Sequence, residues 1–243
     1  MASTTPQEAV LYQFSLCPFC HKVRAGLELK GIPYRTVEVN PRSKTELPPL
    51  PAGAPQKVPV LQVGDRTVFD STTILNFLDE AYPETRRFNP EDAAQRKQSD
   101  DIEAWVDDEF IRSLPTVIYG TWGEAAQAAR LVARSSNFGV LQGLGMKLGG
   151  SVIMHLVAKR ILKKSGQADA HAWVGANLDK FEGWLGTQDF VCGAELSLAD
   201  VAMVGAINCV REFPIYREIM RRPVLAGWFS RMEQSKEQAA KAA

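Results

Sequence analysis

The stretch "LCPFCHKV", residues 16–23, lies where an apolar segment ends and a helical pattern begins. The segment before it, residues 9–14, is apolar and aromatic, which is typical of a buried strand. The helical pattern after it is predicted to end at Gly31 and Pro33, and residues 34–40 then alternate as a second strand. Because a crossover helix joins strands that pair in parallel, the chain is predicted to open with a parallel β-α-β unit.

The helical pattern also predicts which side chains of this first helix are buried. Val23, Gly26 and Leu27 share one face, which should be buried, whereas Lys22, Glu28 and Lys30 are predicted to lie outside.

The next segments complete a small α/β unit over residues 1–83. Residues 41–57 are rich in proline and predict a long loop. Residues 58–70 predict two short strands around a Gly-Asp turn, and a helix should follow from Ser71, a good N-cap residue. We therefore expect a mixed sheet covered by helices.

A charged linker is predicted over residues 84–95, and residues 96–243 show helical patterns without strand signals. The predicted fold class is thus an α/β N-terminal domain followed by an all-α C-terminal domain. The predicted helices cover residues 91–112, 121–133, 138–164, 169–186, 197–211 and 224–238. The five tryptophans are predicted to be core anchors, with Trp105 beside the cleft between the domains.

Composition excludes several classes of function. The 28 basic and 28 acidic residues balance, so a broad nucleic-acid-binding surface is not expected. Four cysteines do not make a secreted disulfide framework, and no signal peptide is visible, which predicts a cytoplasmic protein. Residues 138–158 are apolar, but Lys147 and five glycines interrupt them, so we expect a buried helix and no membrane span.

Cys17 and Cys20 are predicted to form a reactive dithiol. Cys17 opens a helix, where unpaired N–H groups and the helix dipole stabilise a thiolate, and Lys22 and Arg24 add positive charge. Cys20 lies one turn later and can attack a mixed disulfide formed at Cys17. Three other interpretations remain open: a zinc clip, which lacks a second ligand pair, a structural disulfide, and two inert core thiols.

Two further motifs are consistent with a glutathione site. "KVPVL" places Pro59 before a central strand, which predicts a cis Val58–Pro59 bond and a Val58 backbone free to bind an extended peptide. "DST" places Asp70 to receive an ammonium and Ser71 to receive a carboxylate at a helix N-terminus. The alternative for Ser71 is a plain helix cap.

"CPFC", "KVPVL" and "DSTTIL" together resemble the glutathione transferase superfamily, as does "LSLADVA", in which Ser197 and Asp200 predict a capping box. Over most of the chain the sequence is most similar to the membrane-associated prostaglandin E synthase type 2 family. The resemblance implies a thioredoxin-like N-terminal domain, a helical C-terminal domain and a homodimer. It implies glutathione contacts from Phe19, Lys57, Val58, Pro59, Asp70 and Ser71.

The resemblance also implies an acceptor pocket between the domains, which in animal members of the family holds haem. The candidate pocket residues here are Trp105, Val140, Leu144 and His155, although a core role is the favoured interpretation of His155. This sequence has Phe14 where the family has a tyrosine that contacts the catalytic sulfur, which puts prostaglandin isomerase activity in doubt.

The predicted function is a glutathione-dependent thiol transferase that acts on a small hydrophobic electrophile or disulfide. A two-domain glutaredoxin, a non-catalytic glutathione or haem carrier and, more remotely, an intracellular chloride-channel-like protein are the alternatives.

Overall fold

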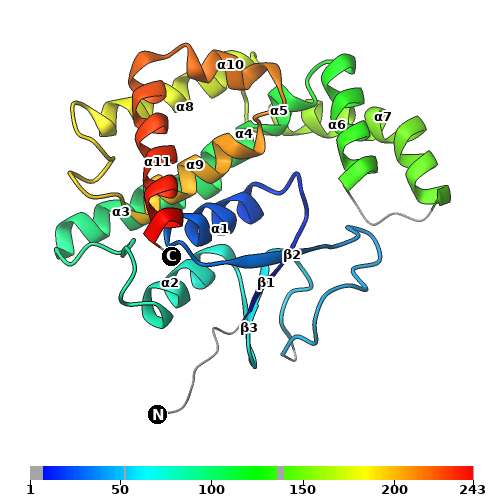
Figure 1. Ribbon diagram of the computed structural model, residues 1–243. Coiled ribbons are helices and arrows are strands. Elements are labelled where there is room, and N and C mark those ends of the chain that lie inside the picture. Colours follow the sequence, from blue (N-terminus) through cyan, green and yellow to red (C-terminus); the bar gives the residue numbers. More distant parts are fainter. Residues whose placement is uncertain (1–7, 52, 136–139, 243) are drawn as a thin grey trace.

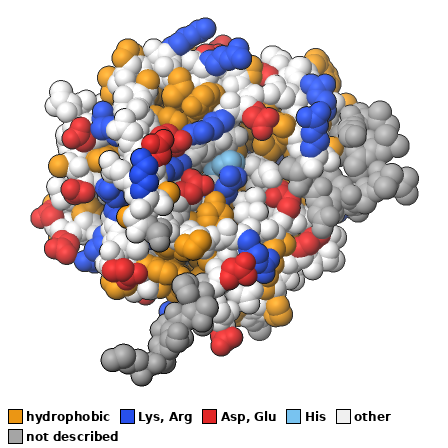
Figure 2. All heavy atoms as spheres, in the orientation of Figure 1, with side chains coloured by type: hydrophobic (Ala, Val, Ile, Leu, Met, Phe, Trp, Pro, Cys, Tyr) orange, Lys and Arg blue, Asp and Glu red, His pale blue; other side chains and the backbone are white. Residues whose placement is uncertain are grey.

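The computed structural model describes residues 8–51, 53–135 and 140–242, with the side chains of residues 135–148 outside that description. Its N-terminal part is an α/β unit, and a larger helical part packs against one face of it (Figure 1). On the face that Figure 2 shows, acidic and basic side chains are interspersed, as the balanced composition predicts.

The sheet has four strands in the order β2-β1-β3-β4. Strands β1 (Ala9–Gln13) and β2 (Tyr34–Glu38) pair in parallel, which confirms the predicted β-α-β unit. Strands β3 (Val60–Val63) and β4 (Arg66–Phe69) form the predicted hairpin, and β3 pairs antiparallel with β1. Gly64, with φ of 56°, makes the turn in a backbone conformation that glycine adopts readily.

Helix α1 (Pro18–Leu29) crosses between β1 and β2 and lies between the sheet and the helical domain (Figure 1). Val23, Gly26 and Leu27 are buried as predicted. The predicted exposure of Lys22 and Lys30 is wrong, because both side chains are buried. A helix covered on both sides has no solvent face, so its lysines must find partners inside the protein.

The helical domain follows α2 (Ser71–Ala81). It starts with α3 (Ala93–Trp105), a five-residue π-helical stretch (Val106–Phe110), and the short helices α4 (Ile111–Ser113) and α5 (Pro115–Ile118). It continues with α6 (Trp122–Ser135), α7 (Val140–Lys164), α8 (Ala170–Leu185), α9 (Leu198–Cys209), α10 (Pro214–Met220) and α11 (Pro223–Ala242).

Most predicted helices are present, but several details differ. The predicted helix over residues 91–112 is interrupted by the π-helical stretch, and the sequence pattern did not predict the short helices α5 and α10. Helix α7 is not fully buried, because one of its faces is exposed. Trp122 is 58% exposed and is therefore not a core anchor, whereas Trp228 is fully buried. No helix of the described residues is long and apolar enough to span a membrane.

The two parts of the chain meet closely between α1 and α9. A β-carbon on Gly205 of α9 would come within 2.5 Å of the backbone of Lys22, so a larger residue would force the two helices apart. The predicted capping box at the start of α9 is present: the Ser197 backbone N–H donates to Asp200. Asp200 also accepts from the indole N–H of Trp228, which ties α9 to α11.

Candidate functional site

Cys17 occupies the N-cap position of α1, and Pro18 follows it in the first turn. This arrangement matches the sequence prediction, because the missing N–H of proline removes no helix hydrogen bond there. Cys17 is half-buried and Cys20, one turn later, is 1% exposed. All four cysteines are free thiols.

The two thiols have opposite shifts in pKa. The Cys20 thiol, followed by the backbone N–H groups of Cys20 and Phe19, lowers the pKa of Cys17 against the effect of burial. Burial, and then the Cys17 thiolate itself, raises the pKa of Cys20. Cys17 is therefore the thiol that ionises first, and Cys20 stays protonated as its hydrogen-bond donor. Neither Lys22 nor Arg24 is among the main causes of this lowered pKa.

The loop between β1 and α1 is held by Glu38 and His21. The carboxylate of Glu38 accepts from the backbone N–H of Ser15 at 2.7 Å and from its hydroxyl at 2.9 Å. The Nε2 atom of His21 lies 2.9 Å from the carbonyl oxygen of Ser15. Burial lowers the pKa of His21 to about 4, so the neutral ring donates this hydrogen bond at neutral pH. The loop that presents Cys17 is thus fixed from both sides.

A cavity of about 230 Å³ lies beside Cys17. The Val58–Pro59 peptide bond is cis, as predicted, and Val58 and Lys57 line the cavity. The structure therefore brings Cys17, Lys57 and Val58 together, as the sequence analysis proposed. The remaining lining residues are Phe14, Val39, Pro41, Lys44 and Leu47, the last four of which come from the chain that follows β2.

Asp70 and Ser71 lie at the start of α2, outside the lining of this cavity. The N-cap residue is Asp70, not Ser71: its Oδ1 atom accepts from the backbone N–H of Thr73 at 3.0 Å. Asp70 has a φ of 71°, an uncommon conformation for a residue with a side chain, and it remains exposed. Ser71 is 4% exposed and begins the helix. The plain-cap interpretation of Ser71 is therefore wrong.

Close to Asp70, a buried ionic network joins the two domains. The ammonium of Lys22 contacts the carboxylate of Glu103, the Oδ2 atom of Asp107 at 2.9 Å and the hydroxyl of Thr72 at 3.0 Å. One cation serves two carboxylates, and Asp107 Oδ1 is buried without a hydrogen-bond partner among the described residues. Burial, and then the charges of Glu103 and Asp70, raise the pKa of Asp107 to about 6 against the attraction of Lys22.

Two residues of the helical domain lie near Cys17 that the sequence analysis missed. The thiol of Cys209 donates to the carbonyl oxygen of Leu16 at 3.4 Å. Burial, and then the charges of Cys209 and Cys17, raise the pKa of Tyr119 to about 12. Burial also raises the pKa of Cys209, with Cys17 again adding to the effect. No local motif marks either residue, because only the packing of α9 and of the end of α5 places them there.

The residues proposed for an acceptor or haem pocket are not gathered around Cys17. Trp105 stacks edge-on against Trp184 at 4.9 Å and lines a different cavity, on the surface of α3 and α8. His155 is buried, with its Nδ1 atom 3.1 Å from the carbonyl oxygen of Tyr119 and its ring against Trp122. The side chains of Val140 and Leu144 lie outside the described residues. The described residues therefore do not fit a haem site, and a core role for His155 is supported.

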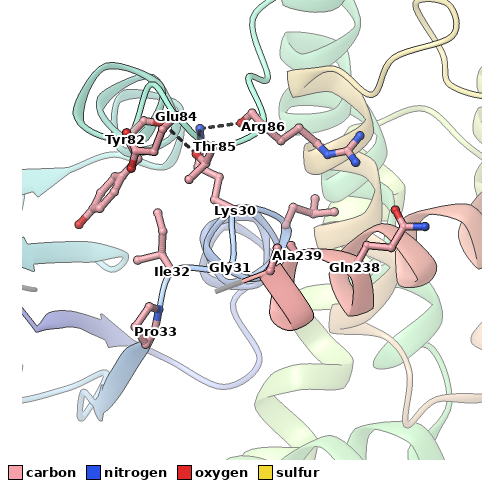
Figure 3. Close-up of a pocket in the computed structure, with 12 residues that line it drawn as sticks. Lys30, Gly31, Ile32, Pro33, Tyr82, Glu84, Thr85, Arg86, Gln238 and Ala239 are labelled. Atoms are coloured by element: carbon pink, nitrogen blue, oxygen red, sulfur yellow. Dashed lines mark hydrogen bonds between the residues drawn. The ribbon is translucent and has the colours of Figure 1, made fainter.

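A larger cavity of about 640 Å³ lies away from Cys17, between the end of α1 and the end of α11 (Figure 3). Lys30 lines this cavity, but its ammonium group is bound to other protein groups. It donates to the Thr85 hydroxyl at 3.0 Å and the Arg86 carbonyl at 2.7 Å, and it pairs with Asp79 at 2.9 Å. Lys30 therefore joins α1 to the chain after α2, and its role is structural.

Comparison with known proteins agrees with this geometry. Residues 11–86 match the family model of the glutathione S-transferase N-terminal domain, and residues 152–236 match that of the C-terminal domain. The chain is 27% identical to prostaglandin E synthase 2 of Danio rerio, over 95% of this chain and 72% of that protein. It is also 27% identical to prostaglandin E synthase 2 of Mus musculus, over 96% of this chain and 71% of that protein.

Solved structures show the same fold. The β-etherase LigF from Sphingobium sp. strain SYK-6 superposes with a TM-score of 0.66 at 19% identity, over 97% of this chain and 99% of that one. FzlA from C. crescentus superposes with a TM-score of 0.60 at 18% identity, over 97% and 92%. With both domain models matched in order and the fold shared along its length, the chain belongs to the glutathione S-transferase superfamily.

Proposed function

We propose that the protein is a glutathione-dependent thiol transferase in which Cys17 is the nucleophile. One observation carries this proposal: the Cys17 thiol, with its lowered pKa, lies at a cavity that Val58 and Lys57 also line. A thiolate attacks disulfides and electrophiles, whereas a thiol does not. The backbone of Val58, which lines the cavity, suits the peptide part of glutathione, and Asp70 and Ser71 suit its γ-glutamyl end.

The reaction proceeds by thiol–disulfide exchange. The Cys17 thiolate attacks the glutathione sulfur of a mixed disulfide, so that a Cys17–glutathione disulfide forms and the other thiolate leaves. A second glutathione thiolate then attacks the glutathione sulfur of this disulfide, which releases oxidised glutathione and regenerates the Cys17 thiolate. The burial and raised pKa of Cys20 favour this route over resolution by Cys20.

The competing functions predict different products. Conjugation would join glutathione to an electrophile, needs one activated thiol group and would not use Cys20. The two-domain glutaredoxin alternative shares the exchange chemistry and differs only in its natural disulfide substrate. Haem has no part in the proposed reaction, because the described candidate residues for it are not gathered at Cys17.

The test is reduction of a glutathione mixed disulfide, measured beside conjugation of an electrophile on the same preparation. We expect exchange to be lost in Cys17→Ser and largely kept in Cys20→Ser, because glutathione resolves the intermediate. Equal loss in the two variants would overturn the assigned roles. Conjugation without exchange would instead favour a simple transferase. The homodimer expected from the family is a separate proposal, tested by light scattering of the full chain.

A further inference from the structure

Helix α7 presents an apolar face to solvent. Ile153 and Leu156 are 64% and 59% exposed, and Val152 and Val157 are also exposed. The opposite face, which includes His155 and Ala158, is buried. A helix that is apolar on all sides is normally buried on all sides. The outer face of α7 therefore lacks an apolar partner among the described residues.

The charged residues of α7 itself are all basic. Residues 125–168 contain seven basic residues and no acidic residue, although the whole chain has a net charge of zero. At 3.6 residues per turn, Arg160 and Lys164 continue the line of Ile153 and Val157 along the helix. Lys159 and Lys163 lie at the edge of the same face, and all four of these basic residues are exposed. The face is thus apolar in its middle and basic at its C-terminal end.

Trp122 adds an exposed aromatic side chain next to α7. Its ring lies 4.4 Å from that of His155, between centroids, and it is 58% exposed. Helices α6 and α7 lie side by side at one edge of the molecule (Figure 1), so Trp122 can approach the same external surface as α7. Tryptophan is favoured where one end of the ring meets an apolar phase and the other meets water.

We propose that the exposed face of α7, together with Trp122, is a docking surface for an anionic lipid bilayer. Ile153, Leu156 and Val157 enter the boundary between headgroups and acyl chains, and the basic end of α7 contacts lipid phosphates. The helix lies on the bilayer and does not cross it. This role is independent of the thiol chemistry proposed for Cys17.

The charge pattern favours a bilayer over a second copy of the chain. A two-fold interface brings the same surface of both copies together. Two α7 faces would bring basic residues into one interface, and α7 itself supplies no carboxylate to pair with them. Anionic lipid provides both of the missing partners, apolar chains and negative charge.

Vesicle binding by the full chain tests the proposal. The probes are vesicles of phosphatidylcholine alone and vesicles in which about a third of the lipid is phosphatidylglycerol. We expect co-sedimentation with the anionic vesicles only, weaker at high salt, and a blue shift of tryptophan emission that Trp122→Phe abolishes. Ile153→Glu should abolish binding, whereas Val224→Glu, at another exposed apolar residue, should not.

Charge variants distinguish docking through this face from nonspecific binding of a basic protein surface to anionic lipid. Each basic residue near an anionic surface contributes about fivefold in affinity, so Arg160→Gln with Lys164→Gln should weaken binding roughly twentyfold. Arg217→Gln with Lys241→Gln, which removes the same charge elsewhere, should leave it nearly unchanged. Equal effects of the two pairs, equal binding to both vesicle types, or no binding would overturn the proposal. The proposal would also be overturned if the protein did not bind vesicles and Ile153→Glu dissociated a dimer. The face would then be an interface between copies of the chain.

Discussion

Replacement of Cys20 provides the sharpest test of the site, because Cys20 is the largest cause of the lowered pKa of Cys17. Cys20→Ala removes the donor, and Cys20→Ser keeps a hydroxyl that can still donate. A hydrogen bond to a charged group contributes about 1.5–3 kcal/mol, and a thiol is a weak donor, so the lower end applies. At about 1.4 kcal/mol per unit, the pKa of Cys17 should rise by about one unit in Cys20→Ala.

The assay is the rate of alkylation of Cys17 with iodoacetamide as a function of pH, followed by mass spectrometry of the peptide that contains Cys17. Cys192 and Cys209 do not affect this readout, because both are buried and both lie in other peptides. We expect the pH midpoint of alkylation to be lower in wild type and in Cys20→Ser than in Cys20→Ala. The same midpoint in Cys20→Ala and Cys20→Ser would refute the reasoning. The lowered pKa would then rest on the backbone N–H groups of α1 alone.

Three other predictions concern the surroundings of the dithiol. Lys22→Met leaves the buried Glu103 and the half-buried Asp107 without their cation and should lower the free energy of unfolding in urea by about 3–5 kcal/mol. The triple variant Lys22→Met with Glu103→Gln and Asp107→Asn should recover much of this loss, and an equal loss in both variants would contradict the network. Ser71→Ala should weaken glutathione binding roughly ten- to a hundredfold by calorimetry, with exposed Ser230→Ala as the control; unchanged affinity would leave Ser71 no binding role. Folding raises the pKa of Asp107 from 3.8 to about 6, so between these pH values the native state holds a proton that the unfolded chain has lost. The stability of wild type relative to Asp107→Asn should therefore fall as pH rises through this range, by on the order of 1–2 kcal/mol, and a flat difference in urea titrations would contradict the shift.

Much of the N-terminal domain follows from local sequence signals. The apolar run over residues 9–14, the Gly-Asp turn and the proline before β3 each act within a few residues, so the parallel unit, the hairpin and the cis bond could be predicted. The position of Cys17 at the N-cap is equally local, since Pro18 fixes the start of α1. Such signals hold because the packing of the domain agrees with them.

The errors arise where the second domain covers the first. Lys22 and Lys30 are polar residues on a helix, and periodicity assigns them to solvent; only the packing of α9 and α11 on α1 shows that they are enclosed. Likewise, the sequence contains no sign that Glu103 and Asp107, more than 80 residues further on, supply the counter-charges of Lys22. Tyr119 and Cys209 approach Cys17 for the same reason. Contacts between distant segments are set by tertiary packing, which a periodic pattern does not encode.

The position of α1 explains why the helical domain matters for the chemistry at Cys17. The backbone N–H groups that lower the pKa of Cys17 belong to the first turn of α1, and Lys22 lies one turn further along the same helix. Lys22 is bound to Glu103 and Asp107 of the helical domain, and its backbone lies against Gly205 of α9. The helical domain therefore fixes the direction in which α1 presents its N-terminus. Because a preorganised donor stabilises charge better than a mobile one, the rigid contact between the domains contributes to the reactivity of a cysteine that lies entirely in the N-terminal domain.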